Sequence, residues 1–172
     1  PLSNFFDMCF IGEAEEMLLE FLSVYRNSLT RNALFENALK IEGMYIPSNY
    51  SIEYYKTGQI FNRTAKNGSP ETIKKRVVND ISRSFLTSSI TTPEAEFSDM
   101  YLIEAMRGCP WSCRFCVAGQ IYKPVRKKDK DALKDEIKGA LLKTGKIGLI
   151  GPSLSDYPYA EEVLSMEGVD FS

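Results

Sequence analysis

The stretch Tyr101-Leu102-Ile103-Glu104-Ala105-Met106 decides the fold of the second half of this 172-residue chain. It is a short, mostly apolar run of the kind that forms a strand buried in a sheet. A second apolar run occupies residues 147–150, and a helical repeat of apolar residues lies between the two: Leu133, Ile137, Ala140 and Leu141. A strand–helix–strand order with short loops predicts an α/β fold with a parallel sheet and right-handed crossovers.

The first half of the chain begins with a similar pattern. Residues 5–11 are apolar at nearly every position, which predicts a strand buried on both faces, and Gly12 ends the run. Apolar residues from Met17 to Tyr25 then repeat with helical period, so we interpret residues 1–26 as the end of a Rossmann-like α/β unit. Residues 27–99 read as a connector with a helix over 30–41, a hairpin over 51–62 and an exposed, extended arm over 74–81.

Composition and the lengths of the apolar runs limit the partners and the compartment that we expect for the protein. The net charge of -2 gives no overall basic surface for nucleic acid. No apolar run reaches the roughly 18–20 residues that a membrane span needs, and no secretory signal is visible. We therefore expect a cytoplasmic protein with reduced cysteines. Because the chain begins at Pro1 and stops at the start of an apparent strand, we also expect it to be an internal piece of a longer protein.

Three of the four cysteines lie in eight residues: Cys109, Cys113 and Cys116 form a C-x3-C-x2-C pattern directly after the 101–106 strand. Thiolates are the ligands of iron–sulfur clusters, and a cubane normally takes four, so a trio leaves one iron open. A structural zinc site needs a fourth Cys or His ligand. The sequence has no histidine, and Cys9 lies inside an apolar run. The pattern favours an iron–sulfur cluster over zinc or free thiols.

The residues around these cysteines resemble a known signature. Residues 104–116, with the aromatic Phe115 just before the third cysteine, resemble the signature of radical S-adenosylmethionine (SAM) proteins. Residues 118–126 are similar to a narrower group that carries an N-terminal cobalamin (B12)-binding-like domain, in which a Gly-Glu step such as Gly12-Glu13 closes that domain. The resemblance divides the chain into the rim of a cobalamin-binding-like domain (1–26), the connector (27–99) and the first βα units of a partial radical SAM barrel (100–172).

The resemblance implies a cofactor arrangement. The three cysteines would hold a [4Fe–4S] cluster, and SAM would bind its open iron and be cleaved to a 5′-deoxyadenosyl radical. Backbone beside Phe115 would contact the adenine of SAM. The loop after the second strand would contact the SAM amino group; here it departs from the common Gly-Gly-Glu-Pro form, and Gly151 and Ser153 are the candidates.

Other roles in this region stay open at this point. Tyr122 either approaches SAM or packs on the barrel rim, and Trp111 either lines the cluster or packs under the loop. Glu104, if it faces a barrel interior, needs a partner such as Arg107. The charged run 126–130 reads as a solvated face, and a nucleic-acid role for it is unsupported.

The remaining expectations concern cofactors and partners. We do not expect this chain to bind cobalamin, because it has no histidine for a lower axial ligand and the corrin-contacting loops of that group would precede residue 1. The partners implied are SAM, a substrate that the sequence does not reveal, and an electron donor such as flavodoxin or ferredoxin. A truncated barrel exposes strand edges, so we expect self-association and no activity from the isolated chain. The alternative function is a non-catalytic iron–sulfur or zinc module for electron transfer or structural support.

Overall fold

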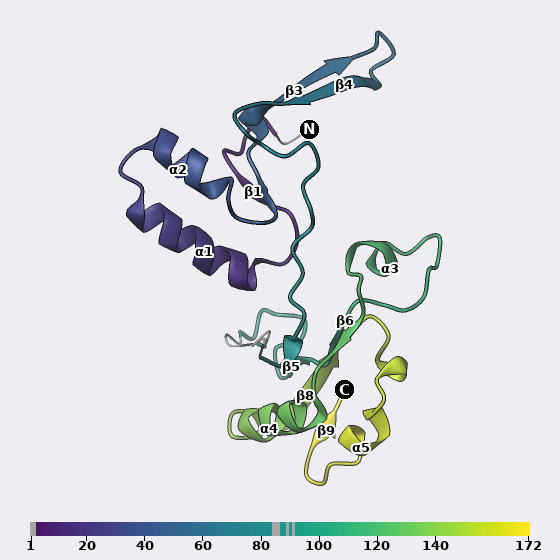
Figure 1. The fold of residues 1–172 in the computed structure, drawn as a ribbon. Helices are drawn as coiled ribbons and strands as arrows, with labels where there is room; N and C mark the ends of the chain where they lie inside the picture. The colour runs from purple at the N-terminus through teal and green to yellow at the C-terminus, as the bar shows by residue number, and fades with distance from the viewer. Residues whose placement is uncertain (1–2, 84–86, 89, 91) are drawn as a thin grey trace. The chain divides into compact units, whose positions relative to one another are not determined.

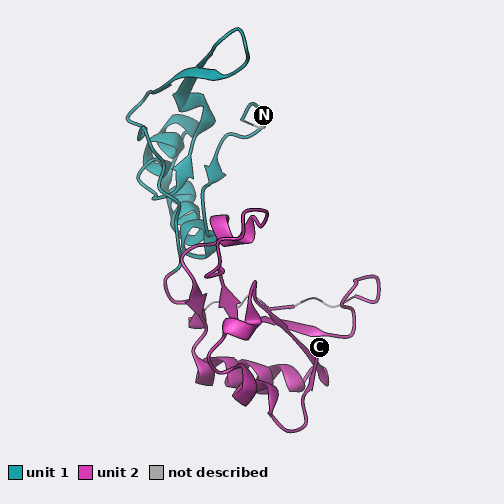
Figure 2. Cartoon of the chain, turned by 90° about the vertical axis from the view of Figure 1, so that its right-hand side faces the viewer, with its two compact units in different colours: residues 1–78 teal, residues 79–172 magenta. Residues whose placement is uncertain are grey.

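The computed structural model describes residues 3–83, 87–88, 90 and 92–172. It divides the chain into two compact units, residues 1–78 and residues 79–172 (Figure 2). Each unit has its own cluster of buried apolar side chains. The boundaries predicted from the sequence fall after residues 26 and 99 instead, and the assignment of those segments to particular kinds of domain stays a prediction.

In the first unit, two helices pack over a short ribbon. Strand β1 (Cys9–Phe10) pairs antiparallel with β2 (Met44–Tyr45), and helices α1 (Ala14–Asn27) and α2 (Arg31–Ala38) lie between them in sequence (Figure 1). The helix predicted to begin at Thr30 is confirmed, since the Thr30 hydroxyl accepts a hydrogen bond from the Ala33 N–H at 3.2 Å. The core of this unit consists of Met17, Ala38, Ile41, Met44 and Ile46.

The prediction that residues 5–11 form a strand buried on both faces is wrong. Only Cys9 and Phe10 form strand β1, its ladder is antiparallel, and the sheet has two strands. Phe5 and Phe6 are exposed, at 80% and 52%. An apolar run shows that a segment can be buried, but the number of neighbouring strands decides how much of it pairs. The Rossmann-like interpretation of this end therefore rests on sequence resemblance alone.

The connector contains the predicted hairpin and a less exposed arm than expected. Strands β3 (Tyr50–Tyr54) and β4 (Ile60–Ala65) pair antiparallel after the 3-10 turn Pro47–Asn49, which confirms the hairpin. Arg76 forms a bridge with Gly12, and its guanidinium contacts two carboxylates of α1, Glu16 at 2.9 Å and Glu20 at 2.7 Å. The arm predicted over residues 74–81 is thus extended at Arg76.

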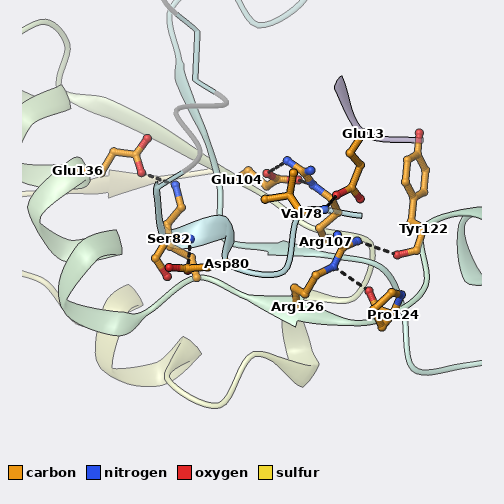
Figure 3. Close-up of polar contacts among 11 residues, drawn as sticks. Glu13, Val78, Asp80, Ser82, Glu104, Arg107, Tyr122, Pro124, Arg126 and Glu136 are labelled. Carbon is orange, nitrogen blue, oxygen red and sulfur yellow. Dashed lines mark hydrogen bonds and ion pairs between the residues drawn. The ribbon is translucent and has the colours of Figure 1, made fainter. Parts of the chain in front are cut away.

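The arm's predicted exposure is wrong at its far end. Val78 is 6% exposed and Ile81 is fully buried. The carboxylate of Glu13 accepts a hydrogen bond from the Val78 N–H at 2.7 Å, as Figure 3 shows, and the chain then turns into the 3-10 segment Ile81–Arg83. The apolar side chains here outweigh the basic neighbours that suggested a solvated arm.

The second unit contains the predicted parallel sheet. Strands β5 (Tyr101–Glu104), β8 (Lys146–Ile150) and β9 (Asp170–Phe171) run parallel in the order β5-β8-β9. Helix α4 (Lys130–Leu141) crosses between β5 and β8, and α5 (Ala160–Leu164) crosses between β8 and β9 (Figure 1). The Asp129 carboxylate caps α4 by accepting from the N–H groups of Asp131 and Ala132. A mixed α/β fold is therefore observed.

The strand predicted over residues 101–106 is interrupted at Ala105. Strand β6 (Met106–Arg107) leaves the parallel sheet and pairs antiparallel with β7 (Arg126–Lys127). Residues 108–125, including the short helix α3 (Ala118–Ile121), form a loop between these two strands (Figure 1). This segment contains the three clustered cysteines, and we call it the cysteine loop.

No helix in the described part of the chain combines the length and the apolar character that a membrane crossing requires.

Candidate metal and cofactor site

The cysteine loop is narrow where it begins and ends. Gly108 has φ +79°, and a Cβ added there would lie 2.5 Å from the Tyr122 carbonyl oxygen and 2.8 Å from that of Pro124. Both distances are shorter than real Cβ contacts, so the two ends of the loop approach this closely only because residue 108 has no side chain. The step from β6 into the loop therefore requires glycine.

A buried arginine holds the returning end of the loop. Arg126 is 7% exposed, and its guanidinium donates to the carbonyl oxygens of Pro124 at 2.9 Å and Tyr122 at 3.1 Å (Figure 3). These are the same two carbonyls that face Gly108. Arg126 thus binds two backbone acceptors at the base of the loop through charge-assisted hydrogen bonds from a buried guanidinium.

The charged run 126–130 is not the solvated face that its composition indicated. Arg126 is buried, and Lys128 is 1% exposed, with its Nζ 2.5 Å from a carboxylate oxygen of Glu136 on α4. The Tyr157 hydroxyl donates to the Lys128 carbonyl at 3.0 Å. Strand alternation places these two basic side chains inward while their neighbour Lys127 is exposed, which charge counting alone does not reveal.

Glu104 has the partner that the sequence suggested. The Arg107 guanidinium donates from Nε to Oε1 at 2.8 Å and from Nη2 to Oε2 at 2.7 Å (Figure 3). Both side chains are largely buried: that of Arg107 is 7% exposed and that of Glu104 is 12% exposed. A bidentate pair of this kind neutralises two buried charges and fixes the backbone that enters the cysteine loop.

The three cysteines differ in exposure. Cys109 is buried beside the neck of the loop, Cys113 is exposed and Cys116 is partly buried; all are free thiols. In chemical terms this donor set fits an iron–sulfur cluster, because three unbridged thiols share one loop. Across the described residues, however, no trio of Cys, Asp or Glu side chains is gathered closely enough to hold a metal ion. Binding would require the loop to bring its thiols together.

The second predicted loop leaves the same edge of the sheet. Glu104 and Ile150 are partners at the carboxyl end of the β5–β8 ladder, so the chain beyond β5 and the loop after β8 start side by side. A Cβ on Gly151 would lie 2.5 Å from Cγ of Met106, so this glycine allows close packing against β6. In parallel α/β sheets, loops at this edge commonly form binding sites.

A carboxylate that the sequence analysis did not single out joins the two loops. The Trp111 indole N–H donates to Oδ2 of Asp156 at 2.7 Å, and the Ser153 hydroxyl donates to the same oxygen at 2.6 Å. These hydrogen bonds, first that of Ser153 and then that of Trp111, lower the pKa of the Asp156 carboxyl from its usual value. The sequence offers one signal for Asp156: it is an aspartate three residues after Ser153, in a loop that follows a strand.

The other two predicted cofactor residues have exposed side chains. Phe115 is 93% exposed and Tyr122 is 46% exposed. The Tyr122 carbonyl, by contrast, contacts Arg126 at the neck of the loop. The structure therefore brings Ser153 near the cysteine loop through Asp156, and leaves Phe115 on the surface of that loop. The predicted contacts of all these residues with SAM stay predictions.

The structure thus defines a mixed α/β protein with a thiol-bearing loop beside a serine-bearing loop at one edge of a parallel sheet. Residues 1–47 match the family described as "Radical SAM proteins, N-terminal". This match supports a radical SAM-related protein and agrees with the resemblance of the cysteine loop, which lies outside the matched residues.

A curated relative also aligns with the chain. Over 169 residues it is 30% identical to "Uncharacterized protein MJ0966" of Methanocaldococcus jannaschii, an alignment that takes in 95% of this chain and 31% of that protein. The chain therefore spans less than a third of the length of this relative. No solved structure matches this chain.

Proposed function

We propose that this chain is part of a radical SAM enzyme in which Cys109, Cys113 and Cys116 hold a [4Fe–4S] cluster. The observation that carries the proposal is the position of the C-x3-C-x2-C loop at the carboxyl edge of the β5–β8 ladder, beside the loop after β8. The family match over residues 1–47 supports it. When bound, the cluster would supply the electron that cleaves SAM to methionine and a 5′-deoxyadenosyl radical.

The chain's own residues would position these groups. Three thiolates leave one iron without a protein ligand, where the amino and carboxylate groups of SAM would bind. Gly151 and Ser153 would face the amino group, and the backbone beside Phe115 would contact the adenine. The neck at Gly108 and Arg126 would fix where the cysteine loop starts and ends, because both of its ends are held by backbone contacts. The substrate and the electron donor, a flavodoxin or ferredoxin, would be supplied from outside.

Anaerobic reconstitution tests the proposal. The chain is incubated with iron, sulfide and a thiol reductant, then desalted and assayed for iron. We expect about four irons per chain and a brown protein whose reduced form gives an electron paramagnetic resonance (EPR) signal. Addition of SAM should change that signal, because SAM binds the open iron. Colourless protein without iron would contradict the proposal.

The same experiment separates the alternative of a non-catalytic electron-transfer or zinc module. A cluster with four protein ligands has no open iron, so its EPR signal would not respond to SAM. A zinc module would take up zinc stoichiometrically and form no cluster. Neither alternative accounts for the family match over residues 1–47.

We propose in addition that the isolated chain associates with itself and has no turnover. In the described part of the chain, β9 has β8 as its one neighbour, so its outer edge presents unpaired N–H and C=O groups. Sedimentation at increasing concentration tests the self-association, and a monomer at the highest concentration would contradict it.

A further inference from the structure

Trp111 is held from two sides within the cysteine loop. It lies two residues from both Cys109 and Cys113, and its indole N–H donates to Asp156 at 2.7 Å. On the other side, its carbonyl oxygen lies against Gly119 of α3, where an added Cβ would come within 2.7 Å. The middle of the loop is therefore fixed to α3 through its backbone and to the loop after β8 through its side chain.

Asp156 is the point at which the two loops meet. Its Oδ2 accepts from both Trp111 and Ser153, and its own N–H donates to the Ser153 carbonyl at 2.9 Å within the 3-10 turn Leu154–Asp156. Charge-assisted hydrogen bonds to a carboxylate are shorter and stronger than neutral ones. One oxygen thus sets the separation between the loop that bears the thiols and the loop that bears Ser153.

We infer that Asp156 is a positioning residue that holds the cysteine loop in register with the loop after β8, so that a cluster-bound cofactor reaches both. This role rests on the proposed function. The neck holds the ends of the cysteine loop, and the contact of Trp111 with Gly119 and the hydrogen bond from Lys123 to Ser112 at 3.0 Å both lie within that loop, so these contacts do not set its position relative to Ser153. A hydrogen bond to Trp111, which is midway in sequence between Cys109 and Cys113, restricts where those thiols can lie relative to Ser153.

The bridge itself is tested by fluorescence, since Trp111 is the chain's single tryptophan. In the cluster-free chain we expect Asp156→Ala to lower the fluorescence anisotropy of Trp111 and raise its quenching by acrylamide. Asp156→Asn keeps an oxygen acceptor and should restore part of both values. Asp135→Ala is the matched control, because Asp135 is an exposed carboxylate on α4 whose side chain pairs with Lys138. Wild-type fluorescence in Asp156→Ala would overturn the bridge.

The positioning role is tested after reconstitution. All three thiols are present in Asp156→Ala, so we expect it to bind iron as the wild type does, and to lose most of the change that SAM causes in the EPR signal. A variant that loses the bridge yet responds to SAM as the wild type does overturns the role and leaves the proposed function intact. A wild type without a cluster, or with one that ignores SAM, removes the proposed function, and this role with it.

Discussion

Arg107 binds both carboxylate oxygens of Glu104, three residues before it on the same path into the cysteine loop. The pair spans Ala105, the residue at which the chain leaves the parallel sheet: the Ala105 N–H still donates to the Ile150 carbonyl at 2.9 Å, and its carbonyl accepts from Lys128 at 2.9 Å. The ion pair therefore stabilises the junction between the sheet and the loop.

Removing one charge of this pair should be costly. We expect Glu104→Gln to lower the free energy of unfolding by about 3 kcal/mol, because it removes the carboxylate charge that pairs with the buried Arg107 guanidinium. Urea denaturation measures the change. Asp135→Asn, which breaks an exposed pair with Lys138 at 3.4 Å, is the control and should cost less than about 0.5 kcal/mol. Equal effects of the two substitutions would show that the buried pair contributes no more to the free energy of unfolding than the exposed pair does.

Two glycines offer a matched comparison at the neck of the loop. Gly108 and Gly58 both have positive φ, +79° and +84°, but an added Cβ at Gly58 meets nothing within 4 Å. Gly58→Ala should therefore cost only backbone strain, about 1 kcal/mol. Gly108→Ala adds a collision with two backbone carbonyls and should cost more than about 2 kcal/mol. Thermal unfolding of the two variants measures the difference, and a similar cost for both would contradict the close approach at the neck.

Much of the second unit follows from the sequence. The apolar strand at residues 101–104, the helical repeat that follows it and the strand at residues 146–150 are local signals, and the structure has all three, with the two strands parallel as predicted. The resemblance also identified Ser153 as a residue of interest, and the structure places its hydroxyl 2.6 Å from a carboxylate that contacts the cysteine loop. Periodicity is reliable here because it depends on neighbouring residues.

The rest depends on contacts between distant residues. Strand β6 looks like a continuation of β5, and its departure from the sheet is decided by pairing with β7, twenty residues later. Asp156 lies forty-five residues from Trp111, and nothing local in either segment indicates that they meet. In the first unit, an apolar run predicted a strand buried on both faces, because the sequence does not show how few strands are available as partners.

Alkaline pH should weaken the second unit through Tyr157. Burial raises the pKa of its phenol to about 12, above its ordinary value of 10.0. Because the unfolded chain loses this proton first, the contribution of Tyr157 to the free energy of unfolding is constant below pH 10 and falls as pH rises from 10 toward 12, by at most about 3 kcal/mol.

Urea denaturation at several alkaline pH values measures this loss. Tyr157→Phe should flatten the fall, although it also loses the hydrogen bond to the Lys128 carbonyl. Tyr54→Phe, at a tyrosine that is 61% exposed, is the matched control and should leave the fall unchanged. A fall of the same depth in Tyr157→Phe would assign the pH dependence to other groups.

Cysteine variants test which thiols hold the metal. Replacing Cys109, Cys113 or Cys116 singly with serine should abolish most iron uptake on anaerobic reconstitution, because two thiolates cannot hold a cubane cluster as three do. Cys9→Ser should bind iron as the wild type does, since Cys9 lies on β1 in the first unit, paired with Tyr45. Iron and sulfide assays with the visible spectrum measure the outcome. If Cys9→Ser also lost its iron, Cys9 would be a fourth ligand, the iron proposed for SAM would be filled, and the electron-transfer alternative would replace the radical SAM proposal.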